Sequence, residues 1–175
     1  MRYHDDYDGR KSFRTAHKRD KHKNNRWHAA DGEFRCSNCR QMVFPTPEMG
    51  TAHRNHCPHC LHSLHVDTRP GNRASDCHAR MAPVGLTWKR NGVDKYGRER
   101  ISDLMLVHAC LGCGTININR IAADDDCEKI LAVFETSLAM EEGKRQRIEC
   151  AGVALLEADD VGLLHRSLFG AVMTK

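Results

Sequence analysis

Cys36-Ser37-Asn38-Cys39 and Cys57-Pro58-His59-Cys60 are the stretches that decide the fold of this 175-residue chain. In each stretch two residues separate the cysteines, so a tight turn can point both thiolates at one metal ion. Seventeen residues separate the two pairs, a spacing typical of zinc ribbons. Four thiolates leave no open coordination position, so we expect a structural zinc site formed by Cys36, Cys39, Cys57 and Cys60.

A third pair, Cys110 and Cys113, predicts a second zinc site whose other ligands come from elsewhere in the chain. Cys77 is the remaining cysteine of this region, and three thiolates with one imidazole form an established zinc set. We expect His65 to be the fourth ligand; the alternatives are His56, His78 and His108. The spacing also allows an exchange in which the second and third cysteine pairs share one metal ion.

Composition favours metal sites over disulfide bonds for these cysteines. The N-terminal Met1-Arg2-Tyr3-His4 lacks the apolar segment of a secretory signal, and no apolar run reaches the roughly 18 to 20 residues that span a bilayer. We therefore expect a cytoplasmic protein without membrane attachment, and in that reducing compartment paired cysteines more often bind metal. Aromatic residues make up only 6% of the chain, a thin core that bound metals would supplement. Cys127 and Cys150 have no neighbouring pair and are expected as small core residues.

Changes in charge and in the spacing of apolar residues divide the chain into three expected parts: a basic extended arm at 1–32, a zinc-binding domain at 33–123 and a helical extension at 124–175. Alternating apolar residues in 83–90 and 104–109 predict a β-hairpin whose strands are connected by the polar segment 91–97, in which Asn91-Gly92 is by itself a good turn signal. Beyond Asp124 apolar residues recur at helical spacing, which predicts helices from about 124, from 141 to 156 and from about 159. The acids Asp124 to Asp126 are expected to supply the N-cap and first turn of the first of these helices. The expected fold class is α+β, with a small zinc-ribbon-like β domain.

The arm carries the clearest charge signal. Between Arg10 and Arg26 the chain has eight Lys or Arg and one acid. This segment has too little apolar area to fold alone. Its charge pattern is typical of segments that bind polyanions. We expect it to be disordered when free and to order on RNA, with further arginines from the globular domain adding phosphate contacts. The predicted RNA-binding residues are Lys11, Arg14, Lys18, Arg19, Lys21, Lys23, Arg26, Arg54, Arg73 and Arg120.

The segment His53-Arg54-Asn55-His56-Cys57-Pro58-His59-Cys60-Leu61 contains the letters R-N-H-C-P and resembles the RNHCP domain family. The resemblance runs from about Phe34 to Asp125. Its departures are Asn72, where the family pattern leads us to expect Asp, and Ala79, where it leads us to expect Gly. Further matching segments are His65-Val66-Asp67, Pro70-Gly71, Arg73, Cys77, Met81-Ala82-Pro83, Cys110, Cys113-Gly114, Asn119-Arg120-Ile121-Ala122 and Asp124-Asp125. The resemblance implies a small bacterial zinc-binding domain and implies no particular activity.

Three functions follow from these features. The first is a structural protein with two zinc ions that binds structured RNA, as a ribosomal or ribosome-associated protein contacting ribosomal RNA and neighbouring ribosomal proteins, with no small-molecule substrate. The second is a DNA- or transcription-associated zinc ribbon, although no expected helix carries the basic and amide side chains of a major-groove reader. The third is an HNH-like nuclease using His53, Asn55 and His56, but the seventeen residues between Cys39 and Cys57 are too few for its ββα unit. We expect a binding protein rather than an enzyme, with no catalytic residues.

Overall fold

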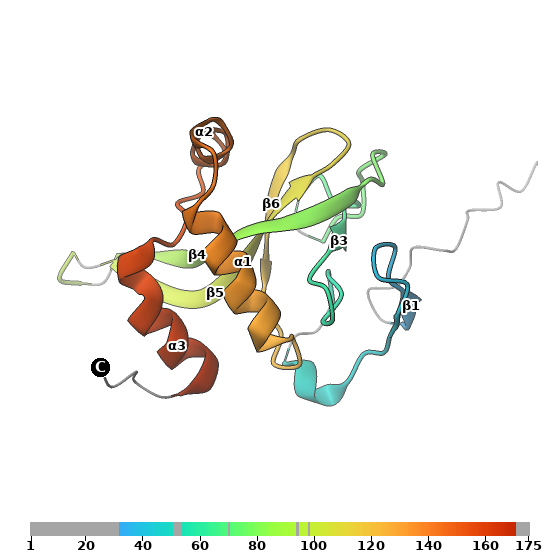
Figure 1. The fold of residues 1–175 in the computed structure, drawn as a ribbon, viewed down its shortest axis with the longest axis horizontal. Coiled ribbons are helices and arrows are strands. Elements are labelled where there is room, and N and C mark those ends of the chain that lie inside the picture. The colour runs from blue at the N-terminus through green and yellow to red at the C-terminus, as the bar shows by residue number, and fades with distance from the viewer. Residues whose placement is uncertain (1–31, 51–53, 70, 94, 98, 171–175) are drawn as a thin grey trace, which may run out of the picture.

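The computed structural model describes residues 32–50, 54–69, 71–93, 95–97 and 99–170 of the chain. These residues form two antiparallel sheets and three α-helices (Figure 1). The expected α+β fold class is therefore confirmed. Apart from its last position, the predicted arm lies outside the described residues.

A long β-hairpin forms the centre of the molecule, and two short strands extend it into a sheet of order β3-β4-β5-β6. A separate two-stranded sheet, β1 with β2, lies at the N-terminal end of the described chain (Figure 1). The strands are β1 (Phe34–Arg35), β2 (Met42–Val43), β3 (Ser63–Leu64), β4 (Arg80–Val93), β5 (Glu99–Cys110) and β6 (Ile116–Arg120).

The predicted hairpin is confirmed, but its first strand extends further into the expected connection 91–97 than the sequence indicated. Asn91 and Gly92 belong to β4, which continues to Val93. The register with β5 shifts between Arg90 and Val93, and Gly92 has a φ of 69°. Because glycine tolerates this backbone conformation, the pair forms an irregularity within the strand instead of ending it.

The helices are α1 (Cys127–Leu138), α2 (Glu142–Cys150) and α3 (Val161–Phe169), with 3-10 turns η2 (Pro47–Met49) and η3 (Ala158–Asp160). Of the acids at 124–126, Asp126 is the N-cap of α1, and its carboxylate accepts the amides of Glu128 and Lys129 at 3.0 and 3.1 Å. The second helix ends six residues earlier than expected, because Gly152 takes a φ of 79° and the amides of Gly152 and Val153 return to the carbonyls of Glu149 and Ile148. Leu156 lies beyond the helix and donates its amide to Leu86 of β4. Cys150 is exposed, so its prediction as a core residue was wrong.

One hydrophobic core joins the helices to the sheet. Leu86, Leu104 and Leu106 of the hairpin pack against Ile130 and Phe134 of α1, which crosses the hairpin in Figure 1. Three fully or almost fully buried leucines complete this core: Leu61, Leu156 and Leu164. No helix among the described residues is long and apolar enough to cross a lipid bilayer.

Candidate metal centres

The three cysteine pairs sit in turns with the same backbone hydrogen bonds. In each, the amide of the first cysteine donates to the carbonyl five residues on, and the amide four residues on donates back to the first cysteine. The residue after the second cysteine takes a positive φ, as at Arg40 (66°), Leu61 (59°) and Gly114 (76°). The donor–acceptor distances are Cys36–Gln41 2.8 Å, Cys57–His62 3.0 Å, Cys110–Thr115 2.9 Å, Arg40–Cys36 3.1 Å, Leu61–Cys57 2.8 Å and Gly114–Cys110 3.0 Å.

The first candidate centre consists of Cys36, Cys39, Cys57 and Cys60. Sulfur atoms from opposite turns approach to 3.6 Å for Cys36–Cys60 and 3.7 Å for Cys39–Cys57. Thiolates held at about 2.3 Å from one tetrahedral zinc lie about 3.8 Å apart, so the four sulfurs match the edges of such a site. Cys36 and Cys57 are buried.

The second candidate centre consists of His65, Cys77, Cys110 and Cys113, whose ligand atoms all lie within 4.8 Å of one another. The Cys77 and Cys110 sulfurs are 3.7 Å apart, and His65 Nδ1 lies 3.2 Å from the Cys113 sulfur. The structure therefore keeps the first two cysteine pairs together and does not adopt the exchange of pairs. Cys77 and Cys113 are exposed, so this centre lies nearer the surface than the first.

The backbone brings His65 to Cys77. Immediately after β3, His65 donates its amide to Ala79 and accepts the amide of His78, at 2.9 and 3.1 Å. This pairing places the histidine beside the segment that carries Cys77. The cluster of ligand atoms includes none of the three alternative histidines, all of which the structure describes: His56, His78 and His108.

The chemistry of the sulfurs fits a bound dication. Burial raises the pKa of Cys57, which disfavours a bare thiolate there, whereas metal coordination removes the thiol proton outright. At the exposed centre, hydrogen bonds from Thr115 lower the pKa of Cys113 to about 6. Backbone amides also donate to sulfur, at 3.4 Å from Asn38 to Cys36 and from Gly112 to Cys110. Both sets can therefore hold a thiophilic metal ion.

Beside the first centre lies a buried ionic network that we did not predict from the sequence. The guanidinium of Arg54 pairs with Asp124 and, at 3.3 Å, with Asp125. Asp125 also faces Nε2 of His56 at 2.7 Å and accepts the amide of Ala122 at 2.8 Å. Arg54, His56 and Asp125 are all buried. The network therefore ties the segment that precedes Cys57 to the start of α1.

His108 lies next to His56 of this network, beneath the turn that carries Cys57 and Cys60. Its Nε2–H donates to the Leu61 carbonyl at 2.7 Å, and Asn119 donates to its Nδ1 at 3.0 Å. Burial, and then the neighbouring His56, lower the pKa of His108 to about 3, so its ring is neutral near pH 7. His108 is therefore a structural support for the turn that carries Cys57 and Cys60.

The predicted RNA-binding residues of the globular domain occupy different environments. Arg54 is buried in the ionic network, so it does not lie on the surface where we expected it to meet phosphate. Arg73 is exposed near Asp67, and Arg120 is exposed and paired with Asp103 at 2.7 Å. The remaining seven lie outside the described residues: Lys11, Arg14, Lys18, Arg19, Lys21, Lys23 and Arg26.

A signal for the interior position of Arg54 was present in the sequence. Asp124 and Asp125 stand directly before the α1 N-cap, where only one acid is needed as the cap. The sequence pattern assigns all three acids at 124–126 to the cap and first turn. In the structure Asp126 alone caps the helix, and the two preceding acids turn towards Arg54.

Comparison with known proteins agrees with the geometry of these centres. No curated protein matches the chain, and no solved structure matches it. The model of the RNHCP domain matches residues 31–131, more than half of the chain, and this span contains all eight candidate ligands. The chain therefore belongs to the RNHCP domain family.

Proposed function

We propose that this protein is a structural zinc protein that binds structured RNA, most specifically ribosomal RNA, as a ribosomal or ribosome-associated component. The observation that carries the proposal is the sequence from Arg10 to Arg26, which places eight cations directly before a domain built around two candidate metal centres. Such an arm can contact the phosphates of RNA, while the domain held together by metal ions presents a rigid surface to structured RNA.

Zinc is the metal that suits both ligand sets. Four thiolates in one centre, and three thiolates with one imidazole in the other, are soft, closed sets that favour tetrahedral geometry, as structural zinc sites do. Cys36, Cys39, Cys57 and Cys60 would hold one ion, and His65, Cys77, Cys110 and Cys113 the other. Each bound zinc would hold separate cysteine-bearing segments together, and its binding free energy would add to the stability of the fold.

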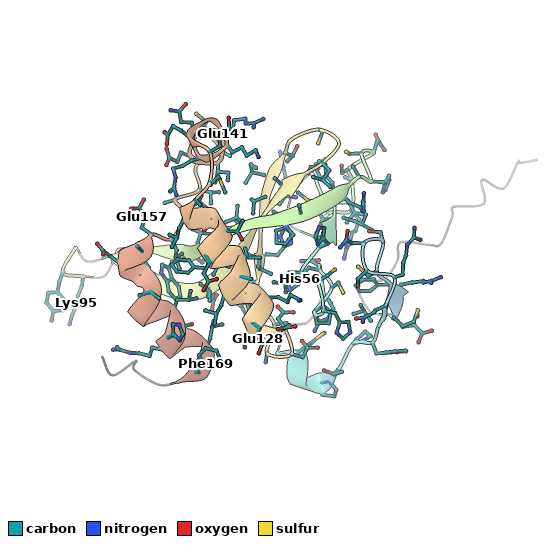
Figure 2. The ribbon with its side chains drawn as sticks, viewed as in Figure 1. His56, Lys95, Glu128, Glu141, Glu157 and Phe169 are labelled. Atoms are coloured by element: carbon teal, nitrogen blue, oxygen red, sulfur yellow. The ribbon has the colours of Figure 1, made fainter. Side chains whose placement is uncertain are left out.

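The charge of the described residues supports an RNA-facing side. Residues 124–170 contain 11 acids and five Lys or Arg, and Glu141 and Glu157 lie on the helical side of the molecule in Figure 2. In the segments that carry the two metal centres, exposed cations occur at Arg35, Arg40, Arg69, Arg73 and Arg80. We expect these segments to contact RNA and the acidic helices to face solvent or neighbouring proteins.

The proposal is tested by fractionating a native cell lysate on sucrose gradients at low and at high salt, with detection of this protein. We expect co-migration with a ribosomal subunit at low salt and release by high salt or by ribonuclease, because phosphate contacts weaken steeply with salt. A protein that stays at the top of the gradient under every condition contradicts the ribosomal proposal.

Binding of the purified protein to RNA separates the ribosomal role from RNA binding itself. Affinity for a structured RNA should fall steeply between low and high salt, and a chain lacking residues 1–31 should show a smaller salt dependence. An affinity that does not change with salt, or a preference for duplex DNA over ribosomal RNA in competition, contradicts RNA as the partner.

A further inference from the structure

The outer end of the β4–β5 hairpin extends past the core of the molecule. Among the described residues, the core reaches along the hairpin as far as Trp88 and Leu104, which are paired across the two strands. β4 continues beyond Trp88 to Val93, and β5 begins at Glu99. At about 3.3 Å per residue, the strands project roughly 15 Å past Trp88 before the chain turns. The hairpin tip is defined as residues 89–100.

The hairpin tip lies far from the place where the basic arm joins the domain. Lys95 of the tip lies at one end of the longest dimension of the described chain in Figure 2, and β1 lies near the other end in Figure 1. The arm precedes β1 in the sequence, so it meets the described chain at that second end. A contact made by the hairpin tip would therefore be separate from those made by the arm.

The sequence of the hairpin tip is basic, in contrast to that of the helices. Residues 89–100 contain five Lys or Arg and two acids, whereas residues 124–170 contain five Lys or Arg and 11 acids. Lys89 and Lys95 of the tip are exposed. A positive segment attracts a polyanion, and one that projects from its domain can reach between neighbouring phosphate chains. The charge and the shape of the tip therefore both suit contact with RNA.

Tyr96 gives the hairpin tip an exposed aromatic ring. It is 71% exposed, more than any other large hydrophobic side chain of the described residues. The ammonium of Lys95 lies 4.9 Å from the centre of this ring, within the range of a cation–π contact. Gly97 follows with a φ of 77°, a conformation that glycine tolerates and that lets the chain turn directly after the tyrosine. An exposed aromatic ring beside cations is the combination on which proteins stack unpaired bases of RNA.

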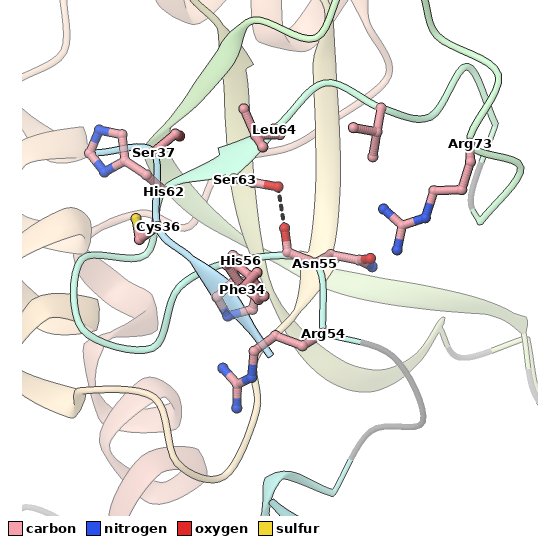
Figure 3. Close-up of a pocket in the computed structure, with 11 residues that line it drawn as sticks. Phe34, Cys36, Ser37, Arg54, Asn55, His56, His62, Ser63, Leu64 and Arg73 are labelled. Atoms are coloured by element: carbon pink, nitrogen blue, oxygen red, sulfur yellow. Dashed lines mark hydrogen bonds between the residues drawn. The ribbon is translucent and has the colours of Figure 1, made fainter. Parts of the chain in front are cut away.

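The cavity beside the first metal centre does not offer a base a comparable place. It lies between β1, the segment before Cys57 and the chain around β3, as Figure 3 shows, and its volume is about 50 Å³. That volume has room for a few water molecules and is too small for a nucleobase. Arg54 and His56, which line it, are buried and paired with Asp125. The exposed ring of the hairpin tip, in contrast, sets no limit on the size of its partner.

We propose that the hairpin tip is a second RNA contact of the protein, in which Tyr96 stacks on an unpaired base while Lys89 and Lys95 contact the neighbouring phosphates. This inference rests on the proposed function, because it names the part of the folded domain that recognises RNA and the RNA feature that it recognises. Unpaired bases occur in the loops and bulges of structured RNA. The tip would therefore select such features, whereas the arm would bind phosphates of any RNA.

The test compares binding of the full, zinc-loaded chain to an RNA stem–loop and to a blunt RNA duplex with the same number of phosphates, at one fixed salt concentration. Tyr96→Ala should weaken binding to the stem–loop about tenfold, the effect of losing one stacked base, and leave duplex binding nearly unchanged. Tyr96→Phe should bind the stem–loop like the unaltered chain, because the ring alone supplies the stacking surface. Phe169→Ala is the matched control and should change neither affinity, because Phe169 is also an exposed aromatic residue but ends α3 on the acidic helical side.

Zinc content and circular dichroism of each variant establish that its fold is intact. If Tyr96→Ala leaves stem–loop binding unchanged, the hairpin tip does not contact RNA, and the inference is overturned while RNA binding stands. Equal losses on both RNAs also overturn it, as does a loss for Tyr96→Phe or Phe169→Ala as large as that for Tyr96→Ala, since stacking of the Tyr96 ring on an unpaired base explains none of these. If the unaltered chain binds neither RNA, the proposed function itself fails.

Discussion

At the scale of single residues, burial and pairing decide what each charged side chain does. Arg54 and Arg73 both appeared in the sequence as candidates for phosphate contact, yet one is an interior ion-pair partner and the other borders a pocket. Because a buried charge is tolerated only when it is paired, Asp125 becomes essential to the interior position of Arg54.

Asp125→Ala should lower the free energy of unfolding by roughly 3–5 kcal/mol, because it leaves the buried Arg54 and His56 without their common partner. Urea unfolding of the zinc-loaded protein measures this. The neighbouring Asp126→Ala, which removes only the α1 N-cap, should lower it by about 1 kcal/mol. Equal losses for the two variants would contradict the structural importance of the network.

Arg40 and Leu61 occupy equivalent positions with positive φ, but their replacement by glycine should have opposite effects. Arg40 is exposed, so Arg40→Gly should raise the free energy of unfolding by about 0.5–1 kcal/mol through relief of backbone strain. Leu61 is fully buried in the core, so Leu61→Gly should lower it by about 3 kcal/mol or more. Thermal unfolding of the two variants compares the signs directly, and a gain for Leu61→Gly would show that strain outweighs packing.

At the scale of elements, the second metal centre depends on how closely its turn approaches the segment that carries Ala79. A Cβ added to Gly112 would lie 2.7 Å from Cβ of Ala79 and 3.4 Å from the Cys77 sulfur. The family pattern led us to expect glycine at position 79, and the structure accommodates alanine there because Gly112 has no side chain. Asn72, the other departure, organises its loop by accepting the amides of Thr68 and Arg69 at 3.0 and 3.2 Å.

Gly112→Ala should therefore reduce the bound zinc from two ions to one, because the added methyl group displaces the segment that carries Cys77. Zinc content by elemental analysis measures the loss. The double variant Ala79→Gly with Gly112→Ala restores the space and should restore the second zinc. A double variant that still binds one ion would show that the turn itself, and not the close approach, rejects the methyl group.

At the scale of the whole molecule, the helices complete the core of the sheet. Leu86, Leu104 and Leu106 of the hairpin pack against residues that follow position 124, and Asp125 neutralises Arg54. Gly85 permits this approach, since a Cβ there would lie 2.5 Å from Leu155. The boundary expected between residues 123 and 124 marks a change in residue pattern along the sequence. The hydrophobic core and the Arg54–Asp125 ion pair nevertheless join residues from both sides of that boundary.

A fragment ending at residue 123 should consequently fail to form the native core. We expect a zinc-loaded 32–123 fragment to bind a hydrophobic dye and to show poor dispersion of its amide resonances, whereas a 32–170 fragment should give the spectrum of a folded protein. A well-dispersed spectrum for the shorter fragment would establish an independent zinc domain.

The two centres should also differ in how readily they release metal. Cys77 and Cys113 are exposed whereas Cys36 and Cys57 are buried, so a chelator should reach the second centre first. We expect biphasic zinc release followed with a colorimetric indicator, and Cys77→Ser should abolish the fast phase only. Loss of the slow phase in that variant would reverse the assignment.

The sequence by itself determined the local chemistry of this protein. Each cysteine turn closes its backbone hydrogen bonds within a few consecutive residues, and cysteine spacing therefore predicted which pairs form turns and that two clusters would result. The hairpin and α1 followed from alternation and from the Asp126 cap for the same reason, because strand pattern and helix capping act over short distances.

Only the tertiary structure decided which histidine joins the second cluster and that Arg54 lies inside the molecule. These features depend on contacts between residues far apart in the chain, such as Arg54 with Asp125 and His65 with Cys113. Histidines recur every third residue from position 53 to position 65, and nothing local distinguishes a ligand from a buried support. Burial is a property of packing, and packing of the helices onto the sheet determined it here.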